Sequence, residues 1–173
     1  MSNRKCVFLV VLLALGTATQ SFGQISNYKA YSIYVYSFSK YINWPEQNSS
    51  EEFVITVVGK SKVREELESM AQTKNVGGKK IVIKNIHSAE EIGSSHIVYL
   101  SDDKSSQLDE ILTKVGDAHT LVIAERDGLV KKGASISFIA LEDNTLRFEV
   151  NEDALSNHHL KVSKSLLSLA YKE

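Results

Sequence analysis

Apolar residues near the N-terminus recur with the period of an α-helix. They lie three or four positions apart, on one helical stripe that comprises Tyr28, Tyr31, Val35, Phe38 and Ile42. Ser26 or Asn27 is placed to cap the start, and Pro45 predicts an end near Asn43, because proline disfavours helical geometry at the preceding residue. The polar face is thin and is not rich in Lys and Arg, as the polar face of a membrane-surface helix would be. We therefore expect this stripe to belong to a protein core.

The middle of the chain alternates strand and helix patterns. Residues 53–59 are rich in β-branched side chains and end in glycine, which indicates a strand buried on both faces. Further strands are predicted at residues 80–86, 96–101 and 119–125. Helical spacing occurs at residues 63–71, Ser88 and Glu91 form a capping box, and a helix beginning at Ser105 or Ser106 turns four side chains inward, namely Leu108, Ile111, Leu112 and Val115. This alternation favours parallel βαβ units.

The pattern changes in the last third of the chain. Residues 134–141 and 145–151 read as two strands joined by a short polar turn, which is typical of an antiparallel hairpin. The polar stretch 125–133 is predicted to be a connection, and residues 163–171 a closing helix with Leu166, Leu167 and Leu169. The predicted fold is a single α/β domain. Its mixed sheet has about six strands, made of βαβ units and the C-terminal hairpin, flanked by helices.

The first residues resemble a secretory signal peptide. Arg4 and Lys5 precede an apolar run at residues 7–15, and small residues follow it. The run is shorter than the roughly 20 residues of a spanning helix, which disfavours a retained anchor. We expect removal of residues 1–23 by cleavage after Gly23, which leaves residues 24–173 as one periplasmic domain without direct membrane insertion.

Composition narrows the function. Without the leader the chain has 18 basic and 21 acidic residues, a formal charge of −3, so nucleic acid is not an expected partner. Cys6, the only cysteine, lies in the leader, which excludes disulfides and thiol chemistry from the domain.

No motif predicts catalysis, a metal site or a cofactor. The stretch "VVGKS" at 57–61 lacks the first glycine of a phosphate-binding loop and reads as a strand-to-helix turn. His96 and His119 begin predicted strands, where solvated side chains are expected. Asp103 is placed to help cap the helix that follows.

Three stretches together resemble the YfiR family, also called DUF4154. They are "KAYSIYVYSFSKYINWP" at 29–45, "GASISFIALEDNTLRFEVN" at 133–151 and "LKVSKSLLSLA" at 160–170. The resemblance implies a periplasmic α/β domain that binds proteins and is not an enzyme. Its best-known members restrain an inner-membrane diguanylate cyclase, which lowers cyclic-di-GMP and biofilm formation. Family members often carry disulfide cysteines, but Ser95 stands at one such position here, so redox control does not carry over.

The expected partner is a membrane signalling protein, through the periplasmic domain of a diguanylate cyclase or a sensor kinase; a homodimer is a further possibility. The candidate contact residues are Lys40, Tyr41 and Trp44 at the end of the first helix, and Arg147, Glu149 and Asn151 on the last strand. An ion pair between Arg147 and Glu149 is an equally good reading of that strand. A periplasmic sensor of a small ligand is the alternative function, and an unrecognised enzyme is the third.

Overall fold

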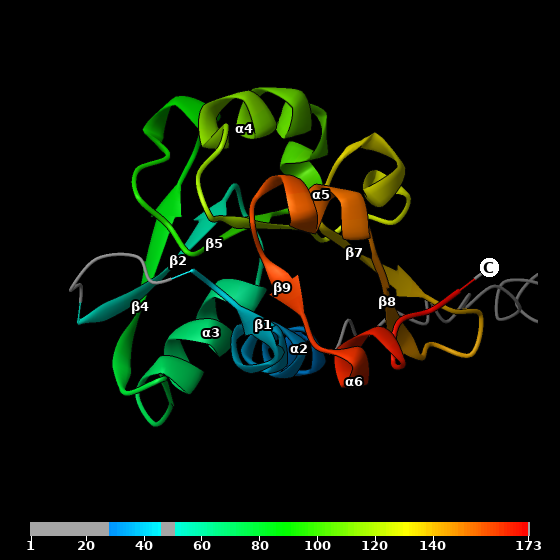
Figure 1. Cartoon of the computed structure of the whole chain (residues 1–173), viewed down its shortest axis with the longest axis horizontal. Helices are drawn as coiled ribbons and strands as arrows, with labels where there is room; N and C mark the ends of the chain where they lie inside the picture. The colour runs from blue at the N-terminus through cyan, green and yellow to red at the C-terminus, as the bar shows by residue number, and fades with distance from the viewer. Residues whose placement is uncertain (1–27, 46–50, 173) are drawn as a thin grey trace, which may run out of the picture.

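A seven-stranded mixed sheet forms the centre of the molecule (Figure 1). The computed structural model describes residues 28–45 and 51–172. The strand order is β3-β4-β2-β5-β6-β7-β8, and a two-stranded sheet β1-β9 lies apart from it. The strands are β1 (Ile42–Asn43), β2 (Glu52–Val58), β3 (Asn75–Val76), β4 (Lys79–Ile86), β5 (Ile97–Leu100), β6 (Leu121–Ala124), β7 (Ile136–Ala140), β8 (Leu146–Val150) and β9 (Lys161–Val162).

The strand order changes direction at β2, because the chain adds β4 on one side of β2 and β5 on the other. Strand β2 pairs in parallel with β4 on one side and with β5 on the other, and β6 and β7 continue the parallel set. The predicted hairpin is confirmed, because β8 pairs antiparallel with β7. In open α/β sheets, ligands bind outside the carboxyl ends of the strands at such a reversal. Here the reversal places the loops after β2 and β5 next to each other.

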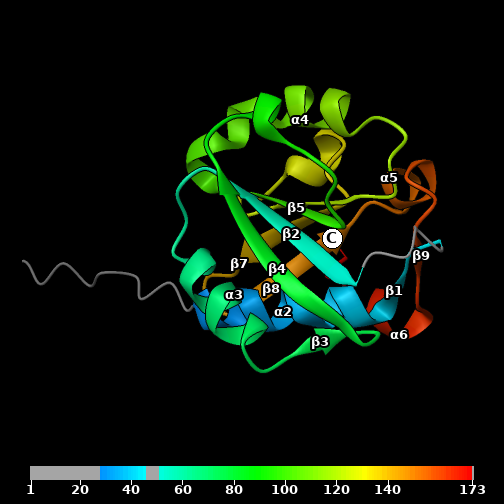
Figure 2. The ribbon, with the colours of Figure 1, turned by 90° about the vertical axis from the view of Figure 1, so that its left-hand side faces the viewer.

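Helices cover both faces of the sheet (Figure 2). Helices α2 and α3 pack on one face and α4 on the other, so that two apolar clusters form. The helical segments are α2 (Tyr28–Tyr41), α3 (Val63–Ala71), η1 (Ala89–Glu91), η2 (Asp102–Gln107), α4 (Leu108–Val115), η3 (Leu129–Lys132), α5 (Glu152–Asn157) and α6 (Lys164–Leu167).

The predicted aromatic stripe forms part of the core. Val35 and Phe38 are completely buried, and the Phe38 ring meets the Phe148 ring edge-on with their centroids 4.9 Å apart. Tyr28 and Tyr31, at the start of the same stripe, are only partly buried. The N-terminal turn of α2 therefore lies at the rim of the core.

Two helices are shorter than predicted. Helix α2 ends at Tyr41 rather than near Asn43, because Ile42 leaves the helix to pair with Val162 of β9. Helix α6 begins as predicted after Ser163, whose side chain accepts a hydrogen bond from the Leu166 backbone, but it ends at Leu167. Leu169, which was predicted to belong to this helix, lies beyond its end and is 59% exposed.

The connection predicted at 125–133 is more ordered than its polarity suggests. It contains η3, whose Leu129 and Val130 are buried. The expected capping box of Ser88 and Glu91 is present. Helix α5 and strands β1, β3 and β9 were not predicted, since they are too short for a periodic pattern to stand out. The proposed leader, residues 1–23, and the caps Ser26 and Asn27 lie outside the described residues.

Candidate functional site

Polar side chains gather where three parallel strands end. Ser61 follows β2, Asp102 and Asp103 follow β5, and Glu125 follows β6. Backbone hydrogen bonds hold these ends in line: Ser101 N donates to Val58 O at 3.0 Å, and the Glu125 N–H donates to the Leu100 carbonyl at 2.9 Å. The group lies beside the first turn of α2, at the edge where α/β sheets bind ligands.

Glu125 sits at the centre of this group. One of its carboxylate oxygens accepts the Asp102 backbone N–H at 3.3 Å. Burial raises the pKa of the Glu125 carboxyl above its ordinary value, and hydrogen bonding to the Ser61 hydroxyl opposes that rise. Glu125 therefore keeps its proton to a higher pH than a solvated glutamate, a property typical of functional sites but also found in structural networks.

Two buried hydroxyl groups near Glu125 make no hydrogen bond of ordinary geometry within the described part of the chain, although the Ser61 side chain lies close enough to the Tyr99 hydroxyl to lower its pKa slightly. They belong to Tyr99 and Ser101, which are completely buried and stand two positions apart on β5, so they face the same side of the sheet. Burial raises the pKa of Tyr99 well above its usual value, and burial together with Glu125 raises the pKa of Tyr31 to about 12. Unpaired buried hydroxyl groups are rare and costly, and they call for an explanation.

The loops around this group are clasped together. The Lys60 backbone N–H donates to Asp103 Oδ1 at 3.0 Å, which links the loop after β2 to the segment after β5. The prediction that Asp103 caps the following helix is wrong, because neither η2 nor α4 has a side-chain hydrogen bond at its N-cap. Across the site, Arg126 Nε donates to Asp102 Oδ1 at 2.6 Å on the exposed surface. The hydrogen bond to Arg126 lowers the pKa of the Asp102 carboxyl.

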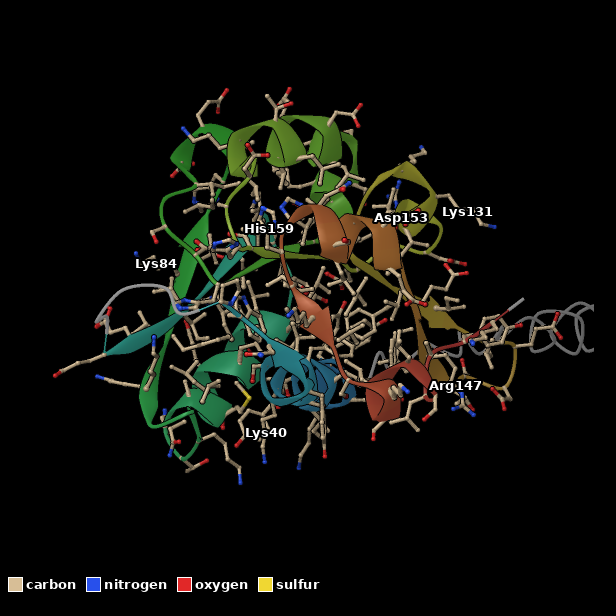
Figure 3. The ribbon with its side chains drawn as sticks, viewed as in Figure 1. Lys40, Lys84, Lys131, Arg147, Asp153 and His159 are labelled. Carbon is tan, nitrogen blue, oxygen red and sulfur yellow. The ribbon has the colours of Figure 1, made fainter. Side chains whose placement is uncertain are left out.

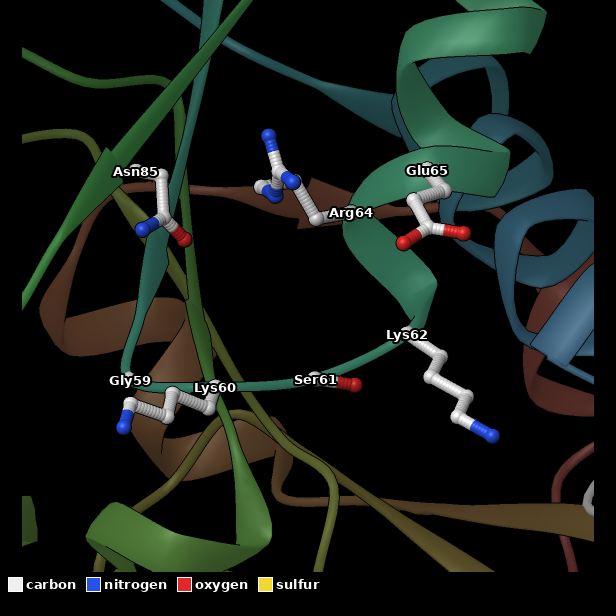
Figure 4. Close-up of a pocket in the computed structure, with 7 residues that line it drawn as sticks. All are labelled: Gly59, Lys60, Ser61, Lys62, Arg64, Glu65 and Asn85. Atoms are coloured by element: carbon white, nitrogen blue, oxygen red, sulfur yellow. The ribbon is translucent and has the colours of Figure 1, made fainter.

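A pocket of about 320 Å³ opens on the β4 side of the loop after β2 (Figure 4). Three cationic residues, one acidic residue and three uncharged residues line it, namely Lys60, Lys62, Arg64, Glu65, Gly59, Ser61 and Asn85. Arg64 also pairs with Glu68 at 2.8 Å. The lining therefore has an excess of positive charge at the first turn of α3.

Of the two histidines predicted to be solvated at strand starts, His96 differs from the prediction. His96 is buried, not solvated: its Nδ1 accepts the Val54 backbone N–H at 3.1 Å and its ring stacks on Phe53. Burial lowers its pKa. His119 is partly exposed, and its Nδ1 lies 3.2 Å from the His158 carbonyl oxygen. Hydrogen bonds to the backbone account for both rings.

The three residues of the first predicted contact group, at the end of α2, do not share one environment. Lys40 is exposed and Tyr41 is 50% exposed. Trp44 is half-buried: its indole N–H donates to the His96 carbonyl at 3.3 Å and its ring meets Phe53 edge-on. Trp44 thus packs onto the amino end of the sheet, whereas Lys40 and Tyr41 face outward.

The second predicted group lies on the edge strand β8. Arg147 is exposed and Glu149 is half-buried. Asn151 caps α5, because its Oδ1 accepts the Ala154 N–H at 2.9 Å, and its amide donates to the Val130 carbonyl at 2.9 Å. Figure 3 shows Arg147 well separated from Lys40, so the structure does not bring the two predicted groups together.

The sequence analysis considered Asp103 only as a helix cap and Ser61 only as part of the stretch 57–61, and it passed over Tyr99 and Glu125. The signal was available for two of them, since Ser61 and Glu125 each follow a predicted parallel strand, where ligand-binding residues tend to lie. Tyr99 gave no signal, because a tyrosine within a buried strand usually reads as core.

Among the described residues, no group of three or more His, Cys, Asp or Glu side chains is placed to hold a metal ion. None of the helices in the described ranges has the length and apolar composition that crossing a bilayer requires.

Two solved structures resemble the chain. A conserved domain protein from Vibrio cholerae O1 biovar El Tor aligns with a TM-score of 0.56 and 15% identity, over 84% of this chain and 59% of that one. The ABC domain in complex with L-Trp from Streptococcus pneumonia aligns with a TM-score of 0.49 and 10% identity, over 68% of this chain and 54% of that one. The chain thus spans less than two thirds of either protein, and only the first likeness supports the fold. No curated protein matches the sequence.

A family model matches residues 28–171, nearly all of the described chain. Its description, YfiR/HmsC-like, is that of a regulatory family that acts in the periplasm. The match confirms the resemblance seen at the three sequence stretches. The chain belongs to the YfiR/HmsC-like family, DUF4154.

Proposed function

We propose that this protein is an exported, non-enzymatic regulator that binds the periplasmic domain of a membrane signalling protein. The partner is a diguanylate cyclase or a sensor kinase, and binding restrains its output. Membership of a regulatory periplasmic family supports the general role. The finer proposal rests on an exposed apolar surface of α2.

The outward face of α2 is the observation that carries the proposal. Ile33 is 57% exposed and Tyr41 is 50% exposed. They lie eight positions apart, which on a regular helix separates them by only about 80°. Lys40 shares this face, and Tyr36, whose ring lies 5.7 Å from the Lys40 ammonium, flanks it.

A neighbouring segment extends the exposed apolar surface. Helix α6 packs beside α2, and the Ser163 N–H donates to the Tyr41 carbonyl at 3.0 Å. Leu169, two residues after α6, is 59% exposed, and Tyr171 is 38% exposed. Exposed apolar side chains on adjacent segments mark interaction surfaces, and Tyr is favoured among residues that dominate binding energy.

The test is recovery of the partner from membranes. Tagged wild-type protein is expected to retain a membrane protein with a periplasmic domain and a signalling domain. Ile33→Asp and Tyr41→Ala should each reduce recovery at least about tenfold, since central contact residues are worth about 2 kcal/mol or more. Glu110→Ala, on α4 across the sheet, is the matched control and should change nothing.

Cellular signalling provides a second readout of the same proposal. Deleting the gene should raise cyclic-di-GMP if the partner is a cyclase, and the Ile33→Asp variant should fail to restore the wild-type level. Recovery of no signalling protein, together with an unchanged cyclic-di-GMP level, would rule the proposal out for a cyclase partner.

A small-ligand sensor is the second candidate function. It is favoured by the buried hydroxyl groups of Tyr99 and Ser101 near Glu125, which make no hydrogen bond of ordinary geometry within the described residues, because a bound polar molecule would satisfy both. A thermal-shift screen of nucleotides and aromatic metabolites tests this function. A ligand whose stabilising effect disappears in Tyr99→Phe would support it, and a flat response across the screen would remove it.

A further inference from the structure

Among the described residues, strand β4 has an outer edge that is unpaired over most of its length. Strand β3 covers it only at Lys79 and Lys80. Within the described residues, no strand pairs with that side of β4 after Lys80. Figure 2 looks onto this edge and shows β4 in front of β2. An open edge presents unpaired backbone groups to any extended chain that approaches it.

The direction of the peptide groups along β4 follows from its pairing with β2. The Lys80 N–H donates to the Glu51 carbonyl at 3.0 Å, and the Ile86 carbonyl accepts the Gly59 N–H at 2.9 Å. The register between β2 and β4 runs without interruption between these points. Because peptide groups alternate in direction along a strand, those of Ile83 and Asn85 point away from β2, toward the open edge.

The same edge is basic in a protein with a formal net charge of −1. Strand β4 carries Lys79, Lys80 and Lys84 and no acidic residue. Lys80 faces Glu52 across the ladder, whereas Lys84 is exposed and faces Thr56. The carboxyl end of β4 leads directly to the pocket of about 320 Å³, where Asn85 lies with Lys60, Lys62 and Arg64.

From these observations, we infer that the β4 edge and the adjoining pocket dock an extended acidic segment of a partner protein by strand addition. The backbone of Ile83 and Asn85 supplies the hydrogen bonds of a new ladder. The half-buried side chains of Val82 and Ile83 offer apolar contacts on alternate faces, and the lysines and the pocket attract the acidic side chains. A second copy of this chain is a poor occupant, because two β4 strands would bring lysines together.

This inference adds a second surface to the proposed function and is tested without the natural partner. The probe is a blocked octapeptide of alternating valine and glutamate, and the control probe alternates valine and lysine. Both are titrated into ¹⁵N-labelled protein. The valine–glutamate probe should shift the amide signals of Ile83 and Asn85 saturably, more weakly at high salt, and the valine–lysine probe should not.

Three outcomes of the titration would overturn the inference. If the valine–glutamate probe does not bind, the lysines of β4 serve to keep strands away from the edge, as edge lysines commonly do. If both probes bind equally, or if the shifts lie elsewhere, the charge and the ladder play no part.

Variants of β4 separate the ladder from the charge. Asn85→Pro removes an outward N–H, and Asn85→Ala keeps it, so the proline variant should bind about fivefold more weakly than the alanine variant. Lys84→Glu reverses an exposed charge without touching the backbone and should weaken binding about fivefold or more. If Asn85→Pro does not fold, the affinity of Lys84→Glu for the valine–glutamate probe still tests the proposal. Equal affinity of Lys84→Glu and wild type would overturn it.

The α2 surface provides the control for independence. Ile33→Asp should bind the valine–glutamate probe as wild type does, while losing the membrane partner. Failure of the probe experiment would therefore leave the proposed function standing, and failure of the membrane experiment would leave the β4 site standing.

Discussion

Replacing Gly59 by alanine tests how tightly the two loops at the end of the sheet are clasped. Gly59 has φ = +98°, which L-residues rarely adopt, and an added Cβ would lie 2.5 Å from Asp103 Oδ1 and 2.5 Å from Lys104 Cγ. The left-handed backbone alone costs about 1–2 kcal/mol, part of which is offset by the lower entropy of the unfolded alanine chain. Displacing Asp103 also removes its hydrogen bond from Lys60 N, worth about 1 kcal/mol or more.

Gly78→Ala is the matched control. Gly78 also has a positive φ, +82°, but nothing lies within 4 Å of its Cβ position. We expect Gly78→Ala to lower the free energy of unfolding by about 1 kcal/mol and Gly59→Ala by about 2–4 kcal/mol.

Urea unfolding followed by circular dichroism measures both values. The double variant Gly59→Ala/Asp103→Ala should lose less than the sum of its single variants, because Asp103 is no longer present to be displaced. If the two glycine variants agree within about 0.5 kcal/mol, the close approach of the loops contributes nothing and the reasoning is refuted.

Three further variants test the core and the titrating groups. Phe38→Ala should lower the free energy of unfolding by about 3–5 kcal/mol, because its ring is completely buried against Phe148; a loss below about 1.5 kcal/mol in urea unfolding would contradict this packing. The pKa of His96 is lowered by burial from 6.5, so the unfolded chain binds more protons below that pH, and stability should fall as the pH drops from 6.5. His96→Asn keeps an acceptor for the Val54 N–H and should reduce this loss of stability. If the variant and the wild type show equal slopes of Tm against pH, His96 is not the cause of the loss. The pKa of Glu125 is raised by burial, so folding disfavours its charged form and stability should decrease as the pH rises through its pKa. Glu125→Gln should remove that decrease, and a variant with an unchanged Tm–pH profile would show that Glu125 titrates as if solvated.

Long periodic patterns determined most of the fold. The predicted helix at 63–71 matches α3, and the pattern of residues 53–59 matches β2. These predictions succeed because apolar residues repeated over many positions must be buried in a core, which leaves few alternatives for the segment. The signature of the family was also readable from the sequence and is confirmed. The short segments β9 and α5 were not readable, because two or six residues carry too little pattern to compete with other local preferences.

The candidate site shows what the sequence left undecided. The sequence shows that Ser61, Asp103 and Glu125 each follow a strand. Whether these residues lie close together depends on the order of those strands in the sheet. That order arises from packing and pairing between segments far apart in the chain, which no local pattern encodes. Likewise, the sequence placed Tyr41 and Trp44 together, and only the tertiary structure turned Trp44 onto Phe53 and left Tyr41 exposed. Local sequence determined which elements form, and burial against distant partners decided which of their side chains remain available for binding.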